Sequence, residues 1–208
     1  MTPLLDPSDT RAVVDRIRDG QVFVYPTDTA YGLGASLDST EAVRRVFRIK
    51  QRSLEKSVPV LTDRQTALRR TSPPGPVRTA VDEFWPGALT LVLSVENPSE
   101  FPPGTTRNGT LALREPAYMP LVKILSDAGM ITGTSANLAG EATPGSIDEI
   151  SPSLREAVDF ILSGPEVDGQ GSTVAEWDAG SECWQIHRKG PITREQLTER
   201  TLGSTREE

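Results

Sequence analysis

The apolar positions along the chain follow two alternating spacings, one typical of helices and one typical of strands. Between residues 8 and 19, Val13 and Ile17 fall on one helical face, with Ser8 as the predicted N-cap. Short apolar runs bounded by Gly, Pro and Asp, such as residues 22–25, indicate buried strands. The same rules predict helices at 8–19, 39–50, 64–70, 77–85, 118–127, 154–162 and 194–200, and strands at 22–25, 33–36, 58–61, 89–95, 110–113, 130–132, 173–177 and 184–187.

Helices and strands therefore interleave from end to end, which indicates an α/β domain built on one large sheet. The 208 residues fit a single domain, and a chain of this size buries roughly 70% of its unfolded surface. We expect residues 1–203 to form that domain and residues 204–208 to be a disordered tail, because chain ends are seldom tied down.

The composition indicates the cellular compartment of the protein. The single cysteine, Cys183, cannot form an internal disulfide, which favours the reducing cytosol. The N-terminus lacks the basic and apolar stretches of an export signal, and no window approaches the ~20 apolar residues that span a bilayer. The sequence predicts a soluble, cytoplasmic protein.

The net charge and the histidine content limit the classes of function that the protein can have. The formal net charge of −7 argues against a protein whose main task is to coat nucleic acid, since that binding scales with clustered cations. This net charge does not exclude a local basic groove. His187 is the only histidine, which excludes metal sites built on several imidazoles, and no metal site is predicted.

One candidate for chemistry is the segment 25–34. A predicted strand delivers the hydroxyls of Thr27 and Thr29 and the carboxylate of Asp28 to a turn, and nearby glycines let a ligand approach the backbone. A well-capped turn explains the same residues equally well.

A second candidate is a group of cations at the end of the helix 39–50. Lys50, Arg52 and Lys56 fall within seven residues. An exposed basic face is the usual explanation, but a triphosphate also needs several donors that converge on one place.

A third candidate is a set of polar groups at strand ends. Ser135 and Asn137 follow the strand 130–132, while Arg114 and Arg188 come directly after two other strands. Such positions suit a ligand crevice in an α/β sheet. An N-cap cluster before a short helix is the alternative for residues 132–137.

Together these segments resemble the YrdC/TsaC family of threonylcarbamoyl-AMP synthases over about residues 8 to 190. The resemblance implies a single domain with a large, twisted, mixed β-sheet flanked by helices. Motifs at the following positions carry it: 26–34, Lys50-x-Arg52 with Lys56, 84–92, 111–114 and 135–137, with later motifs at 171–174 and 187–190.

The resemblance also implies a role for particular residues. It makes Lys50 and Arg52 catalytic, with Lys50 beside the phosphates. The threonine-binding set that it implies is Thr29, Arg114, Ser135 and Ser172. The ATP-binding set that it implies is Arg52, Lys56, Thr110, Asn137 and Arg188.

The activity implied is that of a nucleotidyltransferase. It would make threonylcarbamoyl-AMP and pyrophosphate from L-threonine, bicarbonate and ATP, with Mg²⁺ arriving on the ATP, for the N6-threonylcarbamoyladenosine modification of tRNA. The resemblance implies two kinds of partner. One is a tRNA threonylcarbamoyl transferase complex that receives the product, and the other is RNA, which the protein would bind weakly. No protein nucleophile is needed, and the sequence presents no Ser/His/Asp or Cys/His set.

The chain departs from the family pattern at three places. Gln51 stands where glycine is usual, Ser57-Val58 replaces Pro-Leu, and Leu61 stands where a histidine often assists threonine binding. Three alternatives stay open: a carbamoyl-adenylate-forming module as in hydrogenase maturation, a paralogue without synthase activity, and an RNA-binding module.

Overall fold

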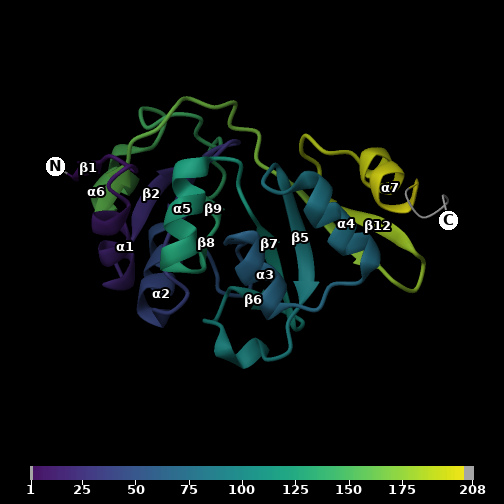
Figure 1. Ribbon diagram of the computed structural model, residues 1–208. Coiled ribbons are helices and arrows are strands. Elements are labelled where there is room, and N and C mark those ends of the chain that lie inside the picture. Colours follow the sequence, from purple (N-terminus) through teal and green to yellow (C-terminus); the bar gives the residue numbers. More distant parts are fainter. Residues whose placement is uncertain (1, 204–208) are drawn as a thin grey trace.

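In the computed structural model, which describes residues 2–203, twelve described strands form two hydrogen-bonded sheets (Figure 1). The first sheet has the order β1-β10-β2-β3-β9, with β1, β10 and β2 parallel and the other neighbours antiparallel. Its strands are β1 (Leu4–Leu5), β2 (Phe23–Pro26), β3 (Tyr31–Gly34), β9 (Thr134–Ser135) and β10 (Phe160–Leu162). The tail predicted at 204–208 lies outside the described residues.

The second sheet has the order β12-β11-β5-β7-β4-β8, and β6 adds to β7. It is also mixed, because β11 with β5 and β4 with β7 are parallel while its other pairs are antiparallel. Its strands are β4 (Val60–Leu61), β5 (Leu89–Ser94), β6 (Thr106–Arg107), β7 (Thr110–Arg114), β8 (Ile131–Thr132), β11 (Thr173–Asp178) and β12 (Cys183–Arg188).

The two sheets meet where the chain passes from β8 to β9. A single bridge joins Ser36 to Ile131, and the Thr132 amide donates to the Ala35 carbonyl at 2.9 Å. At Gly133 the chain leaves the second sheet for the first, and a Cβ there would lie 3.1 Å from the Leu61 side chain. The α/β class with mixed sheets is confirmed, and the expected single sheet is divided at this crossover.

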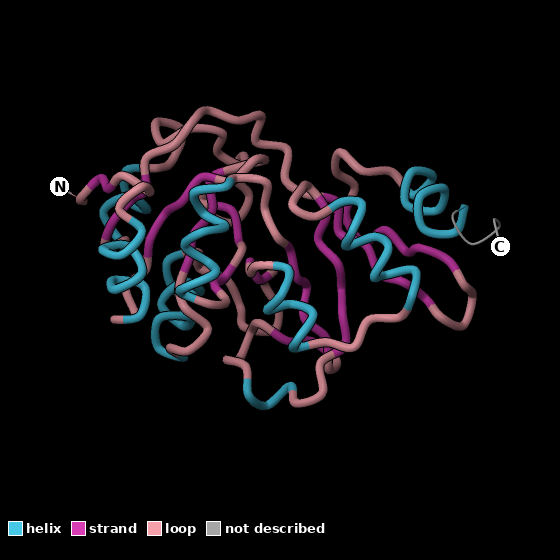
Figure 2. Tube along the Cα trace, viewed as in Figure 1, coloured by secondary structure: helices cyan, strands magenta, loops and turns pink. Residues whose placement is uncertain are grey.

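The helices cover both faces of the first sheet and one face of the second (Figure 2). Apolar side chains of α1 and α5 pack with one core cluster of the first sheet, and those of α2 and α6 pack with another. Side chains of α3, α4 and α7 pack on the second sheet. The helices are α1 (Thr10–Arg18), α2 (Thr40–Ile49), α3 (Arg64–Arg70), α4 (Gly75–Phe84), α5 (Met119–Ala128), α6 (Pro152–Ala157) and α7 (Arg194–Leu202), with a short 3₁₀ helix η1 (Pro98–Glu100).

The opposite face of the second sheet carries no helix among these seven. Along β5 and β7 fully buried leucines alternate with the half-buried Val92 and Ala112, the pattern of a sheet that packs on one face only. The half-buried side chains line a cavity instead of the core. This face therefore supplies part of the candidate site.

The helix predicted at 154–162 is wrong in its second half. Helix α6 ends at Ala157, and Phe160–Leu162 form β10. The Phe160 ring stacks on Phe23 of β2 at a centroid distance of 4.9 Å, and Asp159 accepts from the Val22 amide at 2.8 Å. The apolar run fits either spacing, and pairing with β2 decides between them.

Smaller differences concern element ends. Asp9, not Ser8, is the N-cap of α1, with its carboxylate accepting from the Ala12 amide. The strand predicted at 33–36 begins at Tyr31 and ends at Gly34, and the strand predicted at 58–61 is only Val60–Leu61. The short strands β1, β6 and β9 have no counterpart in the prediction.

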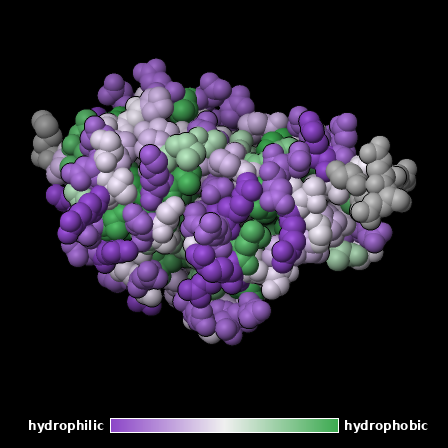
Figure 3. All heavy atoms as spheres, in the orientation of Figure 1, coloured by the Kyte–Doolittle hydropathy of each residue, from purple (hydrophilic) through white to green (hydrophobic). Residues whose placement is uncertain are grey.

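The surface in view is mostly hydrophilic, with isolated apolar patches (Figure 3). Within residues 2–203, the helices are too short or too polar to cross a bilayer.

Candidate functional site

Two adjoining cavities border the uncovered face of the second sheet, and residues of the first sheet also line one of them. The first, here called the Arg114 cavity, is about 230 Å³ in volume and the second, the Thr110 cavity, about 650 Å³. Arg52, Pro59 and Arg188 line both. The two cavities therefore share a wall that carries two cations.

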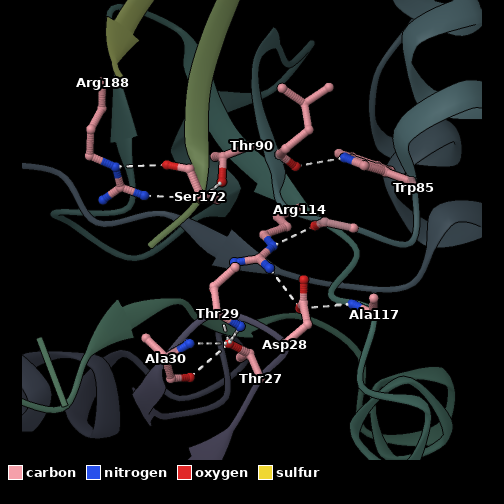
Figure 4. A network of polar contacts seen from close by, with 12 residues as sticks. Thr27, Asp28, Thr29, Ala30, Trp85, Thr90, Arg114, Ala117, Ser172 and Arg188 are labelled. Atoms are coloured by element: carbon pink, nitrogen blue, oxygen red, sulfur yellow. Dashed lines mark hydrogen bonds and ion pairs between the residues drawn. The ribbon is translucent and has the colours of Figure 1, made fainter. Parts of the chain in front are cut away.

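The turn between β2 and β3 supplies one wall of the Arg114 cavity. The Thr27 hydroxyl accepts from the amides of Thr29 and Ala30, both at 3.1 Å, and donates to the Ala30 carbonyl at 2.7 Å. These bonds close the turn and hold the Thr29 hydroxyl in the cavity (Figure 4). The capped turn considered from the sequence is present, and it also lines a cavity.

Arg114, at the end of β7, is held by acceptors on three sides. Its guanidinium donates to Gly87 O at 2.7 Å, Thr29 Oγ1 at 2.8 Å and Asp28 Oδ1 at 2.6 Å (Figure 4). Arg114 is 5% exposed. Burial lowers the pKa of Arg114, which the Asp28 charge partly offsets. Two of its five N–H groups remain for a ligand carboxylate.

A second arginine is fixed at the end of β12. Arg188 donates to the backbone and the hydroxyl oxygen of Ser172, both at 3.0 Å. The Ser172 hydroxyl lies 2.7 Å from that of Thr90 on β5. Burial, and then the charge of Arg114, lower the pKa of Arg188. Two arginines that repel one another in this way favour an anionic ligand between them.

Arg52 belongs to the loop after α2. Its Nε donates to Lys56 O at 2.8 Å and its Nη2 to Ser57 O at 3.0 Å, so the side chain folds back along its own loop. Burial lowers the pKa of Arg52. Its place in the shared wall lets one guanidinium reach ligands in either cavity.

Lys50, the C-cap of α2, lies behind the cavities and is 5% exposed. Its ammonium donates to Ser135 O at 2.5 Å, Asn137 O at 2.7 Å and Asn137 Oδ1 at 3.2 Å. Burial and the nearby charge of Arg52 lower the pKa of Lys50 to about 8, although Glu141 opposes the shift. Lys50 thus ties α2 to the end of β9, which carries Ser135, and to Asn137 just after it.

The predicted site residues fall into three places. Thr29, Arg52, Arg114, Ser135, Ser172 and Arg188 line the Arg114 cavity. Thr110 lines the other cavity with Arg52 and Arg188. Lys50, Lys56 and Asn137 line neither: Lys50 and Asn137 bond to one another behind Ser135, and Lys56 is exposed on its loop. Their roles stay predictions.

Other lining residues were missing from the predicted set. In the Thr110 cavity they include Val92, Arg107, Ala112, Glu176 and His187. Alternation along the predicted strands could have found several of them, because every second side chain of a strand lies on the same face. The strands concerned are those predicted at 89–95, 110–113 and 173–177. His187, interpreted from the sequence as a packed or exposed strand residue, is exposed on β12.

Two departures from the family pattern acquire a physical meaning. Gln51 follows α2 with φ of 50°, a backbone region that glycine adopts without steric cost. Leu61 lines the Arg114 cavity beside Gly133, and it presents an apolar wall at the position where the resemblance implies a histidine.

Within the described part of the chain, no three His, Cys, Asp or Glu side chains are grouped so as to hold a metal ion. The donors around the cavities are mainly guanidinium, hydroxyl and backbone groups. Such donors suit carboxylates and phosphates.

Comparisons with known proteins agree with the fold. The Sua5/YciO/YrdC family model, described as "Telomere recombination", matches residues 15–190. A Bacillus subtilis protein named threonylcarbamoyl-AMP synthase is 31% identical over 196 residues, which are 92% of this chain and 56% of that protein. A Mycobacterium tuberculosis H37Rv protein named putative threonylcarbamoyl-AMP synthase is 31% identical over 191 residues, 90% of this chain and 87% of that protein.

Among solved structures, Pyrococcus abyssi Sua5 complexed with L-threonine superposes with a TM-score of 0.84 at 26% identity. The match covers 96% of this chain and 60% of that one. The chain thus spans little more than half of the B. subtilis and P. abyssi proteins and most of the M. tuberculosis one.

Proposed function

This chain belongs to the Sua5/YciO/YrdC family, and from that premise we propose that it is a threonylcarbamoyl-AMP synthase. The observation that carries the proposal is the shared wall of Arg52 and Arg188 between a small polar cavity and a larger one. An amino acid and a nucleotide bound in these two cavities would meet at the two cations. The relatives' names and the P. abyssi complex with L-threonine support the same assignment.

We place L-threonine in the Arg114 cavity. The remaining N–H groups of Arg114 would bind the carboxylate, and the hydroxyls of Thr29 and Ser172 lie within the same cavity. Ser135 also lines this cavity, and the Lys50 ammonium donates to its carbonyl. The apolar Leu61 offers a surface for the threonine methyl group.

We place ATP in the Thr110 cavity, with its phosphates at the shared wall. The threonine amine and bicarbonate would give a carbamate and water. A carbamate oxygen would then bond to the α-phosphorus, and the bond from that phosphorus to the oxygen bridging to the β-phosphate would break, so that pyrophosphate leaves with the electron pair. Arg52 and Arg188 would stabilise the charge that develops on the phosphates, and alignment of the two reactants would supply several kcal/mol more.

Lys50 and Asn137 would act by holding the end of β9, which carries Ser135, and Lys56 by approaching the triphosphate when it binds. Mg²⁺ would arrive with ATP and be held mainly by the phosphates, since phosphate oxygens and water are its usual partners. The product would pass to a tRNA threonylcarbamoyl transferase complex in the cytoplasm.

The test is to mix the protein with ATP, Mg²⁺ and bicarbonate, add each amino acid in turn, and measure pyrophosphate. Threonine alone should give a strong response, and omission of bicarbonate should abolish it. Arg52→Ala should remove the response while the fold persists. A salt-dependent affinity for RNA without ATP turnover would replace this proposal with the RNA-binding alternative.

A further inference from the structure

A carboxylate lies among the cations of the Thr110 cavity. Glu176 of β11 and His187 of β12 line it together with three arginines. Glu176 Oε2 and His187 Nε2 are 2.7 Å apart, and their side chains are 40% and 48% exposed. Guanidinium groups suit phosphate oxygens, whereas a carboxylate repels them. Glu176 therefore faces a different part of a nucleotide bound here.

A β-bulge brings His187 to this position. Val174 pairs with Arg188 and Ala175 pairs with Ile186, which leaves His187 between the two pairs. In a regular strand His187 and Arg188 would point to opposite faces, but a bulge re-aims side chains locally. Both residues line the cavity. The bulge thus places a phosphate-binding cation beside the Glu176–His187 pair.

The floor next to the pair is apolar and made by neighbouring strands. Val92 of β5 lies opposite Ala112 of β7, and Glu176 is in register with Val92 on its other side. Val174 and Val92 are half-buried, as is Ala112. Small side chains on adjacent strands give a flat surface that a planar base can cover, and about 650 Å³ is ample for a nucleotide.

We propose that Glu176, oriented by His187, selects the nucleoside of ATP by accepting a hydrogen bond from it. Two donors have the required chemistry, the ribose 2′-hydroxyl and the exocyclic amine of adenine. His187 contacts Oε2, and within residues 2–203 no hydrogen bond engages Oε1, which is therefore the acceptor. This inference rests on the proposed function, because it assigns one contact within the same ATP site.

The pair is suited to a clean test. A hydrogen-bonded pair of side chains that is nearly half exposed contributes little to stability, so Glu176→Ala should fold normally. Glu156→Ala is the matched control, because Glu156 is exposed on α6, which packs on the other sheet.

The experiment measures binding by calorimetry with ATP and with inorganic tripolyphosphate, which has no nucleoside. Glu176→Ala should weaken ATP binding by about tenfold, the loss expected for one hydrogen bond to a charged group. Binding of tripolyphosphate should not weaken. Unchanged ATP affinity in Glu176→Ala, or an equal loss for both ligands, would overturn the inference.

Two analogues identify the donor. Deoxy-ATP lacks the ribose 2′-hydroxyl, and inosine triphosphate lacks the exocyclic amine. The analogue without the donor should bind the unaltered protein about tenfold more weakly than ATP and should lose nothing further in Glu176→Ala. If both analogues lose affinity in Glu176→Ala as ATP does, Glu176 does not read either donor and the inference is wrong.

The same samples separate the two proposals. Absence of threonine-dependent pyrophosphate from the unaltered protein, with ATP binding intact, would contradict the synthase assignment but not the role of Glu176. Threonine-dependent turnover with the same KM for ATP in Glu176→Ala would contradict only the role of Glu176.

Discussion

At the scale of single residues, the candidate site depends on charges held by few partners. Asp28 provides the negative charge that faces Arg114, with 2.6 Å between Oδ1 and Nη2, and it also accepts from the Ala117 amide at 2.9 Å. The Arg114 side chain is 6% exposed and that of Asp28 21%. Removing the negative charge would leave a buried cation to be balanced by the ligand.

We predict that Asp28→Asn lowers the free energy of unfolding by about 1–3 kcal/mol, because a hydrogen bond between charged groups becomes one to a neutral amide. Saturating L-threonine should recover more stability in this variant than in the unaltered protein, since its carboxylate replaces the lost charge. Chemical denaturation with and without threonine measures both effects. Asp148→Asn, at an exposed loop position, is the control, and an equal loss there would contradict the role of Asp28.

The lowered pKa of Lys50 can be tested by titration. Its pKa should be near 8, and Arg52→Ala should raise it because a neighbouring positive charge disappears, whereas Glu141→Gln should lower it further. Titration of ¹³C-labelled lysine side chains by NMR measures these pKa values. Arg48→Ala, an exposed cation of the same helix, should leave the Lys50 signal where it was.

The sign of the effect on stability follows from the direction of the shift. From pH 8 toward the ordinary lysine value of 10.5, the folded protein has released the Lys50 proton while the unfolded chain still holds it. The unfolding free energy contributed by this group therefore rises with pH over that window. A Lys50→Met variant should lack the rise, and an identical pH profile in that variant would refute the lowered pKa.

Residue identity predicted part of the site. Arg114 and Arg188 were found because cations just past a strand lie at the sheet edge, where α/β proteins bind ligands. Glu176 shares a face with Val174 in a predicted strand, so alternation could have found it, whereas the side-chain direction of His187 depends on a bulge between paired strands. Nor does spacing alone reveal that the Lys50 ammonium bonds to backbone carbonyls behind the cavities.

At the scale of elements, the end of α2 controls the loop that bears Arg52. Gln51 lies there with φ of 50°. We predict that Gln51→Gly raises the free energy of unfolding by about 0.5–1 kcal/mol. Glycine removes the steric cost of the left-handed backbone, and this gain exceeds the additional conformational entropy that glycine loses on folding. Chemical denaturation measures the change, and Gln51→Ala should show no comparable gain. Stabilisation of both variants alike would mean that backbone strain is not the cause.

Elements were predicted well where one spacing fits alone. Helix α3 was predicted with the ends that it has, and β5 within one residue. The errors fall where a contact distant in sequence decides. Phe160–Leu162 became a strand by pairing with β1 and β2, and the two-residue strands β1 and β9 exist only through their neighbours.

At the scale of the whole molecule, two ligands that bind the folded state should stabilise it. At one hundred times its dissociation constant a ligand adds about 2.7 kcal/mol, which corresponds to a rise in Tm of about 5–10 °C for a domain of this size. Thermal unfolding with ATP, with threonine and with both measures the effect.

Variants should separate the two cavities in that assay. Thr29→Ala should reduce the shift with threonine alone, and Thr110→Ala the shift with ATP alone, since each residue lines one cavity. Arg188→Ala should reduce both shifts. If Thr29→Ala reduced the ATP shift as strongly as the threonine shift, the division into two compartments would be wrong.

The guanidinium groups of Arg52 and Arg188 border both cavities. A ligand that binds in one cavity therefore changes the electrostatic potential in the other. Thermodynamic linkage then requires reciprocity: whatever factor ATP imposes on the affinity for threonine, threonine must impose on the affinity for ATP. A pair of dissociation constants determined in each order must close that cycle, and replacing either arginine should bring the factor closer to one.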